Sequence, residues 1–236
     1  MVGNYKMTYK VDLVLCIDAT GSMTDIMKQV KNNAFRLHAD ILKRMNEKNK
    51  KIDQLRVRLI AFRDYIADGD KAMFASEFFT IPEETEKYKR ALSLIEPDGG
   101  GDIPEDGLEA LAYAMRSKWE TDSIKKRHVI SVWTDAPAHP IGFCKNAPNY
   151  PARLPESFEE LSKWWGDRQN KGYMDNRAKR LVIFAPTHEE SDARVPSYWQ
   201  RIAENWDNAM LSPVEPGKGL TDYGYDDIID KICSTI

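Results

Sequence analysis

The stretch that decides the fold runs from residue 11 to residue 22 and reads Val11-Asp12-Leu13-Val14-Leu15-Cys16-Ile17-Asp18-Ala19-Thr20-Gly21-Ser22. Its first seven residues are mostly apolar and predict a buried strand. Its last five place the carboxylate of Asp18 and the hydroxyls of Thr20 and Ser22 in a tight turn. All three groups offer hard oxygen atoms, which Mg²⁺-like cations prefer. An amphipathic helix is expected next, so the turn should lie where a parallel sheet carries its functional loops.

Strand-like and helix-like segments alternate along the chain. The predicted strands cover residues 11–17, 55–62, 75–81, 128–133, 180–185 and 209–214. The predicted helices cover residues 22–45, 82–95, 158–165, 198–204 and 225–233, with another beginning at Pro104. Strands that are apolar on both faces indicate a parallel sheet covered on both sides. The prediction is an α/β, doubly wound, Rossmann-like fold: a mostly parallel six-stranded sheet, one antiparallel edge strand (75–81), and a single domain over residues 1–236.

Composition excludes several classes of protein. Apolar residues make up 42% and charged residues 30% of the 236 residues, and the formal net charge is -3. That balance does not favour nucleic-acid binding, which needs a concentrated basic surface. Neither a membrane-spanning segment nor a secretory signal is visible, so no membrane association is expected. Cys16, Cys144 and Cys233 form no CxxC pair, which argues against a disulfide scaffold or a zinc site and favours a cytoplasmic location.

Two later loops carry the same kind of oxygen chemistry as the first. Residues 99–105 combine three glycines with Asp102 and Glu105 where a helix is expected to start. Asp135 follows the predicted strand 128–133. Because the carboxyl ends of parallel strands share one edge, with the functional site where strand order reverses, all three loops are expected to converge there.

Individual residues in and around these loops also have simpler interpretations. Thr20 and Ser22 are residue types that cap helices, and Asp135 is a common turn residue. Asp64 ends the second predicted strand and is expected at most to support the site through contacts with its ligands. His139 is a single histidine four residues after Asp135, so it is expected to be a surface or hydrogen-bonded loop residue.

Together the three loops make the chain resemble a von Willebrand factor A domain with a metal-ion-dependent adhesion site. The Asp-x-Ser/Thr-x-Ser signature of that family matches Asp18, Thr20 and Ser22, and its later strand-end aspartate matches Asp135. The order of the expected elements also fits the family over nearly the whole chain. The resemblance implies a bound Mg²⁺, with Mn²⁺ or Ca²⁺ as alternatives.

The second loop departs from the pattern of many A domains, which use a threonine there. Its sequence, Gly-Gly-Gly-Asp-Ile-Pro-Glu, is similar to the Asp-x-Pro-Glu loop of integrin β-subunit domains. By that resemblance Glu105 binds the metal, and Asp102 binds through water, holds the loop or serves a neighbouring ion. The same resemblance points to Asp25 for an adjacent ion, although Ile26 stands where a second acidic residue would be expected.

The function implied by the resemblance is a non-catalytic, cation-dependent protein-binding module. In this family the open coordination position of the metal takes an acidic side chain from a partner protein. The chain resembles bacterial stand-alone A domains of phosphorylation or stress-response systems, and also those that bind AAA+ ATPases in metal-chelatase assemblies. The proline-rich segment 136–155 borders Asp135 and is expected to influence which partner binds. Oligomeric state is not indicated.

Two other functions remain open at this stage. A Mg²⁺-dependent phosphoryl-transfer hydrolase of the haloacid dehalogenase type also places an aspartate at the end of its first strand. That enzyme needs a second aspartate two positions later as general acid, where this chain has Thr20. The other alternative is a scaffold whose metal is purely structural. Sequence motifs of other enzyme classes, such as GxSxG, HExxH or a Walker loop, are absent from the chain.

Overall fold

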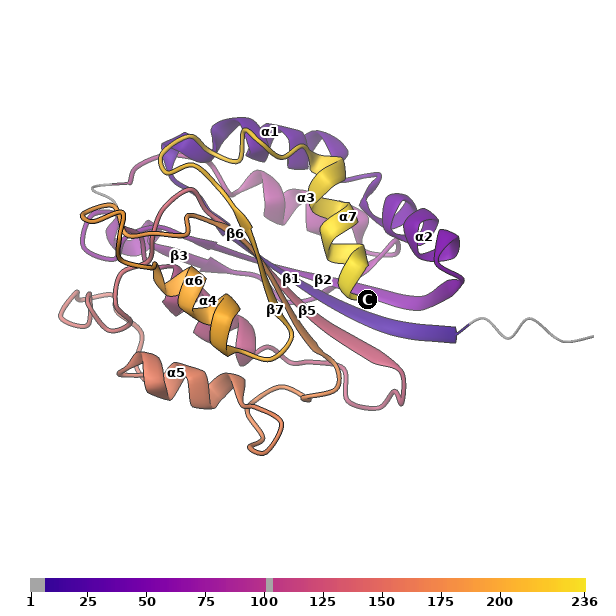
Figure 1. Ribbon diagram of the computed structural model, residues 1–236. Coiled ribbons are helices and arrows are strands. Elements are labelled where there is room, and N and C mark those ends of the chain that lie inside the picture. Colours follow the sequence, from indigo (N-terminus) through magenta and orange to yellow (C-terminus); the bar gives the residue numbers. More distant parts are fainter. Residues whose placement is uncertain (1–6, 101–103) are drawn as a thin grey trace, which may run out of the picture.

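A sheet with helices on both faces forms the centre of the molecule (Figure 1). The structure is a computed structural model that describes residues 7–100 and 104–236, and within them the sheet has seven strands. The strands are β1 (Met7–Asp18), β2 (Lys50–Phe62), β3 (Met73–Ala75), β4 (Phe79–Ile81), β5 (Lys126–Trp133), β6 (Lys179–Ala185) and β7 (Ala209–Pro213). The α-helices are α1 (Thr24–Asn33), α2 (Leu37–Glu47), α3 (Thr85–Ser93), α4 (Gly107–Met115), α5 (Phe158–Trp165), α6 (Tyr198–Asn205) and α7 (Tyr225–Thr235). Two short 3₁₀ helices are η1 (Gly21–Met23) and η2 (Gly69–Lys71).

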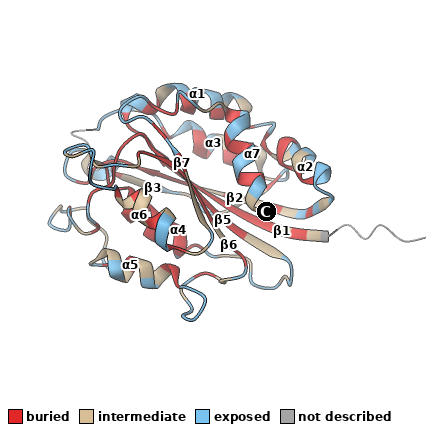
Figure 2. Ribbon diagram, in the orientation of Figure 1, coloured by how far each residue is buried: buried red, intermediate tan, exposed pale blue. Residues whose placement is uncertain are grey.

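Strand β1 is buried on both faces, which explains its nearly continuous apolar sequence. Leu13 and Leu15 belong to the core beneath α1, α2, α3 and α7, whereas Val14 and Cys16 belong to the core beneath α4, α5 and α6. Successive side chains of a strand point to opposite faces, so a central strand between two helical layers needs apolar residues on both. Figure 2 shows the resulting buried stripe through the middle of the sheet.

The strand order reverses at β1. The sheet runs β3-β2-β1-β5-β6-β7, with β4 also paired to β2. Strand β1 pairs in parallel with β2 on one side and with β5 on the other. The carboxyl ends of these three strands therefore meet at one edge, and this is where doubly wound sheets bind their ligands.

The expected fold class is confirmed, and the edge of the sheet shows one local difference. In place of the single edge strand predicted over residues 75–81, the structure has two short strands, β3, which begins earlier at Met73, and β4, both antiparallel to β2. Between them Ser76 keeps contact with β2, because its hydroxyl accepts from the Leu59 N–H at 2.9 Å and its own N–H donates to the Leu59 carbonyl at 2.9 Å. The interruption adds a seventh strand to the six that were predicted.

The helix predicted over residues 22–45 is also divided. It consists of η1, α1 and α2, with a turn between Asn33 and Leu37. In that turn the Arg36 N–H donates to the Asn33 carbonyl at 2.8 Å. Ala34 and Leu37 remain buried on either side, so the apolar periodicity continues across the break and the sequence pattern could not reveal it. No helix within the described residues has the length and apolar character needed to cross a bilayer.

Candidate metal centre

The first loop holds the carboxylate of Asp18 in a fixed orientation at the end of β1. One of its oxygens, Oδ1, accepts from the Thr20 N–H at 2.9 Å and from the Thr20 hydroxyl at 2.7 Å. The other, Oδ2, accepts from the Thr134 hydroxyl at 2.7 Å. Asp18 itself is fully buried. The turn that the sequence predicted as a cation ligand loop therefore fixes its carboxylate from both sides.

The third loop joins the first through Ser22. The Ser22 hydroxyl donates to Asp135 Oδ1 at 2.9 Å and lies 3.3 Å from the Thr20 hydroxyl. The other Asp135 oxygen, Oδ2, accepts from the Gly219 N–H at 2.6 Å. A side chain at Gly219 would place its Cβ 2.7 Å from the Ser22 carbonyl oxygen, and the φ angle there is +65°. Glycine is therefore required for this close approach.

The second loop brings Glu105 beside the first. A Cβ added at Gly100 would lie 3.0 Å from Thr20 Cγ2 and 3.3 Å from Glu105 Oε1, so both side chains border the same glycine. The backbone of Glu105 is held by the segment 136–155, with its N–H donating to the Pro137 carbonyl at 3.1 Å. Glu105 is buried, and its Oε2 has no hydrogen-bond partner among the described residues. We call Asp18, Thr20, Ser22, Glu105 and Asp135 the oxygen site.

Burial makes ionisation of the carboxyl groups in the oxygen site costly. Removal from water raises the pKa of Asp18 to about 6, with the nearby carboxylate of Asp135 adding to the increase. Burial likewise raises the pKa of Glu105 to about 10, and the carboxylates of Asp18 and Asp64 raise it further. The donor set consists only of hard oxygens, and one buried carboxylate oxygen has no partner. These residues fit a hard divalent cation such as Mg²⁺.

The raised pKa of Glu105 predicts how stability depends on pH when no cation is bound. Between the pKa of an unfolded-chain glutamate and about 10, the native state keeps a proton on Glu105 that the unfolded chain has released. The unfolding free energy should therefore fall as pH rises, by up to about 2.7 kcal/mol between pH 6 and pH 8. Glu105→Gln, which mimics the protonated form, should remove this decrease. Urea titrations in chelator at both pH values measure the effect.

Mg²⁺ provides the control for that measurement. It should restore stability to the wild-type chain at pH 8 and do less for Glu105→Gln. Asp25→Asn, an exposed change outside the oxygen site, should behave as wild type. Parallel pH profiles for wild type and Glu105→Gln in chelator would contradict the prediction.

A buried arginine fastens the first two loops together. The Arg63 Nε donates to the carbonyls of Ala19 and Asp98, both at 2.9 Å. The two terminal nitrogens donate to the carbonyls of Lys71 and Glu96, both at 2.6 Å. The guanidinium therefore joins backbone from the loops that follow β1, β2 and α3, and it fixes the base of the oxygen site.

Comparison with known proteins decides the family. A family model described as von Willebrand factor A domain matches residues 12–146, more than half of the chain. The chain belongs to the von Willebrand factor A domain family. The matched part of this A domain includes all three loops of the oxygen site.

Individual relatives agree with this assignment. The α-protein kinase vwkA of Dictyostelium discoideum is 28% identical over 161 residues, which are 65% of this chain and 24% of that protein. The A domain thus spans about a quarter of the length of that relative. Among solved structures, the pilus adhesin SpaC from Lactobacillus rhamnosus GG superposes with a TM-score of 0.50 and 14% identity, over 95% of this chain and 30% of that one. A second SpaC structure, in an open conformation, gives a TM-score of 0.50 and 13% identity. At these identities the likeness shows the fold alone.

Other predicted residues of the A domain lie elsewhere. Asp102 falls outside the described residues. Asp25, a candidate for an adjacent ion, is exposed on α1 and pairs with Lys28 at 3.4 Å, so the structure does not bring it to the oxygen site. His139 was expected to be either a surface residue or a hydrogen-bonded loop residue. It is buried, and its Nδ1 is hydrogen-bonded to Asp106. Asp64 pairs with His139, with 3.6 Å between Asp64 Oδ2 and His139 Nδ1.

Sequence reasoning missed several residues that shape the A domain's site. Thr134 immediately precedes Asp135 in the sequence, but its hydrogen bond to Asp18 was not predicted. Neither Arg63 nor Gly219 belongs to a recognisable sequence motif. The Arg63 side chain donates to backbone carbonyls, and Gly219 contributes its own backbone N–H. The only sequence signal for Gly219 is the Gly217-Lys218-Gly219 turn in a loop beyond the last strand.

Proposed function

We propose that this A domain is a divalent-cation-dependent protein-binding module. The oxygen site would hold Mg²⁺, with Mn²⁺ or Ca²⁺ as alternatives, through Asp18, Thr20, Ser22, Glu105 and Asp135. A bound cation supplies the positive charge that attracts an acidic side chain of a partner protein. Membership of the family supports a protein-interaction role, and the finer mechanism rests on the site described above.

The observation that carries the proposal is a set of buried carboxyl groups in the oxygen site that, within the described residues, have no lysine or arginine partner. The carboxyl groups of Asp18, Glu105 and Asp135 are buried; those of Asp18 and Asp135 accept from the hydroxyls of Thr20 and Ser22, and Glu105 borders the same glycine as Thr20. None of the ion pairs in the described residues gives a lysine or arginine partner to any of the three. Buried carboxylates without cationic partners cost free energy, which a divalent cation would offset.

The exposed side of the oxygen site indicates where a partner would approach. Gly21 and Ser22 are exposed, as are Gly99 and Gly100 in the second loop, whereas Asp18 and Asp135 are buried behind them. Neutral hydroxyl ligands such as those of Thr20 and Ser22 leave more of a cation's charge available to an incoming carboxylate. Direct ligation by Glu105 would reduce that charge, so Glu105 sets how strongly a partner acid binds.

The arrangement around Asp18 supports binding rather than catalysis. A phosphoryl-transfer enzyme of the haloacid dehalogenase type would need a carboxylic acid two residues after Asp18. Thr20 occupies that position, and its hydroxyl donates to Asp18. We further infer a cytoplasmic setting, because Cys16, Cys144 and Cys233 are all buried and unpaired, as in proteins kept reduced.

Capture experiments with and without cation test the proposed function. The immobilised chain is incubated with lysate of the source organism in Mg²⁺, in chelator, and in chelator followed by excess Mg²⁺, and captured proteins are quantified by mass spectrometry. Specific partners should fall about tenfold or more in chelator and return with Mg²⁺, in line with a charge-assisted contact of about 1.5–3 kcal/mol. Ser22→Ala should weaken capture, and Asp25→Ala should not.

The outcome that would overturn the proposal is specific. Partners that remain bound in chelator, and equally to wild type and Ser22→Ala, would mean that any metal here is structural. Hydrolysis of a phosphate ester that requires Asp18 would instead identify an enzyme.

A further inference from the structure

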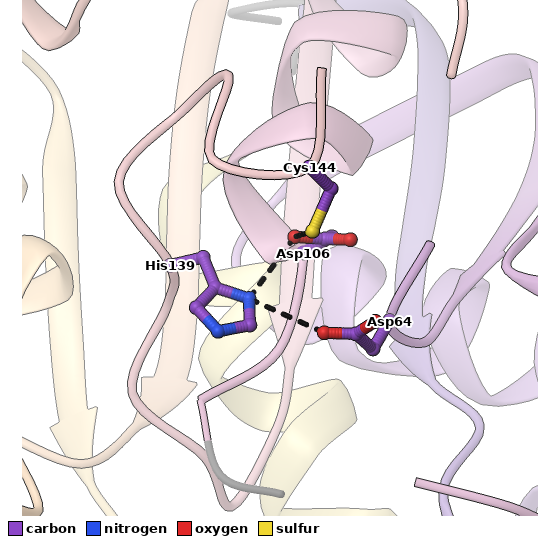
Figure 3. A group of neighbouring side chains, drawn as sticks. All are labelled: Asp64, Asp106, His139 and Cys144. Atoms are coloured by element: carbon purple, nitrogen blue, oxygen red, sulfur yellow. Dashed lines mark hydrogen bonds and ion pairs between the residues drawn. The ribbon is translucent and has the colours of Figure 1, made fainter. Parts of the chain in front are cut away.

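A second group of side chains that could bind a metal lies close to the oxygen site, and one of its members, Asp106, directly follows Glu105 in the chain. Asp64, Asp106, His139 and Cys144 each offer one ligand atom, and these four atoms lie within 4.8 Å of one another (Figure 3). None of the four residues is more than 5% exposed. We call them the His–Cys cluster. Unlike the oxygen site, it combines oxygen, nitrogen and sulfur.

The distances inside the His–Cys cluster match those of a tetrahedral zinc site. Zinc bonds of about 2.0–2.3 Å give a tetrahedron with edges of about 3.3–3.5 Å. His139 Nδ1 lies 3.2 Å from Asp106 Oδ1 and 3.6 Å from Asp64 Oδ2. Cys144 Sγ lies 3.4 Å from the same Asp106 oxygen. Three edges are therefore already close to the lengths that a zinc ion would impose.

Contacts outside the His–Cys cluster orient its ligands. Asp106 Oδ2 accepts from the Tyr65 N–H at 2.7 Å, which leaves Oδ1 facing the cluster. Asp64 Oδ1 accepts from the Ala67 N–H at 2.7 Å, which leaves Oδ2 facing it. The His139 ring stacks on Phe143 with centroids 4.3 Å apart. Such outer contacts fix ligand orientation in protein metal sites.

The charge of the surroundings also favours a cation. Both ion pairs of Asp64 and Asp106 go to one imidazole, that of His139. Burial raises the pKa of the Cys144 thiol, and the carboxylate of Asp106 raises it further. Buried carboxylates need compensation, and a divalent ion would supply more of it than one imidazolium.

We propose that the His–Cys cluster binds a zinc-type transition-metal ion. Thiolate and imidazole ligands select zinc over magnesium, and four protein ligands without an open position are typical of structural rather than catalytic zinc. The absence of CxxC pairs did not reveal this cluster, in which Cys144 and the nearby His139 meet two aspartates from distant parts of the chain. The ion would fasten the segment 136–155 to the end of β2 and the start of α4. This proposal does not depend on the function proposed for the oxygen site.

Cobalt spectroscopy on the metal-stripped full chain tests the proposal. Co²⁺ reports tetrahedral geometry through strong visible bands and thiolate ligation through a charge-transfer band in the near ultraviolet. The titration is done in excess Mg²⁺, so that the oxygen site is supplied with its preferred cation. One equivalent of Co²⁺ should produce both features, and Zn²⁺ should displace it.

Three variants assign the signal. Cys144→Ser should lose the charge-transfer band and weaken Zn²⁺ binding by more than about 100-fold, since loss of outer contacts alone reaches 10–100-fold. The double change Cys16→Ser and Cys233→Ser, which leaves Cys144 as the sole thiol, should keep the band even if Cys144→Ser fails to fold. Asp18→Ala should also keep it, which separates this cluster from the oxygen site. Absence of tetrahedral bands from wild type, or of the charge-transfer band from the sole-thiol variant, would overturn the proposal.

Discussion

Asp18→Ala is expected to reduce Mg²⁺ affinity by at least about 100-fold while the chain stays folded. Asp18 is the buried centre of the oxygen site, where it orders the hydroxyls of both Thr20 and Thr134. Loss of a charged ligand at about 2.7 kcal/mol or more corresponds to that change in affinity. Capture of cation-dependent partners should fall to the level seen in chelator. Isothermal titration with Mg²⁺ and circular dichroism measure the two parts of the prediction.

The matched control for this change is Asp25→Ala. Both substitutions remove an aspartate near the start of α1, but Asp25 is exposed and, within the part of the chain that the structure describes, forms an ion pair only with Lys28. Its removal should leave Mg²⁺ affinity and partner capture unchanged. If Asp18→Ala bound Mg²⁺ as tightly as wild type, the cation would have to bind elsewhere and the proposed function would fail.

Arg63→Met is expected to lower the unfolding free energy by at least about 3 kcal/mol. The side chain is buried, and its guanidinium donates to four backbone carbonyls from three loops. Hydrogen bonds that involve a charged group contribute about 1.5–3 kcal/mol, and carbonyls left buried without a donor add a penalty. In a chain of this length the loss corresponds to a fall in Tm of about 6–12 °C. Urea and thermal unfolding followed by circular dichroism measure it.

Arg90→Met separates this effect from a general loss of positive charge. Arg90 is exposed on α3, so its replacement should change stability by less than about 0.5 kcal/mol. Arg63→Met should also weaken Mg²⁺ binding, because the loops of the oxygen site lose their common anchor. Equal stabilities for the two variants would show that the Arg63 hydrogen bonds contribute little beyond what water supplies to the unfolded chain.

Much of the fold was predictable because it depends on periodic patterns. The apolar run that ends at Asp18 defined β1, and the alternation of strands and helices gave the doubly wound sheet. The turn between Asn33 and Leu37 escaped prediction because the buried stripe continues through it. The split of the edge strand was not predicted, because it occurs where the Ser76 hydroxyl, in place of a backbone carbonyl, accepts from the Leu59 N–H of β2.

The candidate site was predictable only where local sequence carries chemistry. The three loops could be placed together because strand ends converge in a parallel sheet. Arg63 could not be linked to them, since its partners are carbonyl oxygens, which every residue has. The His–Cys cluster was equally hidden, because Asp64 and Asp106 lie far along the chain from the segment that holds His139 and Cys144, and no spacing rule relates these places. Whether Asp102 or Glu105 is the direct ligand stays a prediction that the Glu105→Gln measurements address.

The anchoring of Asp135 by the loop before α7 has a consequence for how this domain can be divided. The family match ends at residue 146, yet Gly217 and Gly219 donate N–H groups to the carbonyl and carboxylate of Asp135. A fragment cut at the boundary of the match would keep every proposed ligand and still lack the groups that aim one of them. The recognisable motif and the smallest unit able to work are therefore different lengths of chain. Transplanting the motif into another protein would require carrying the distant glycine turn with it.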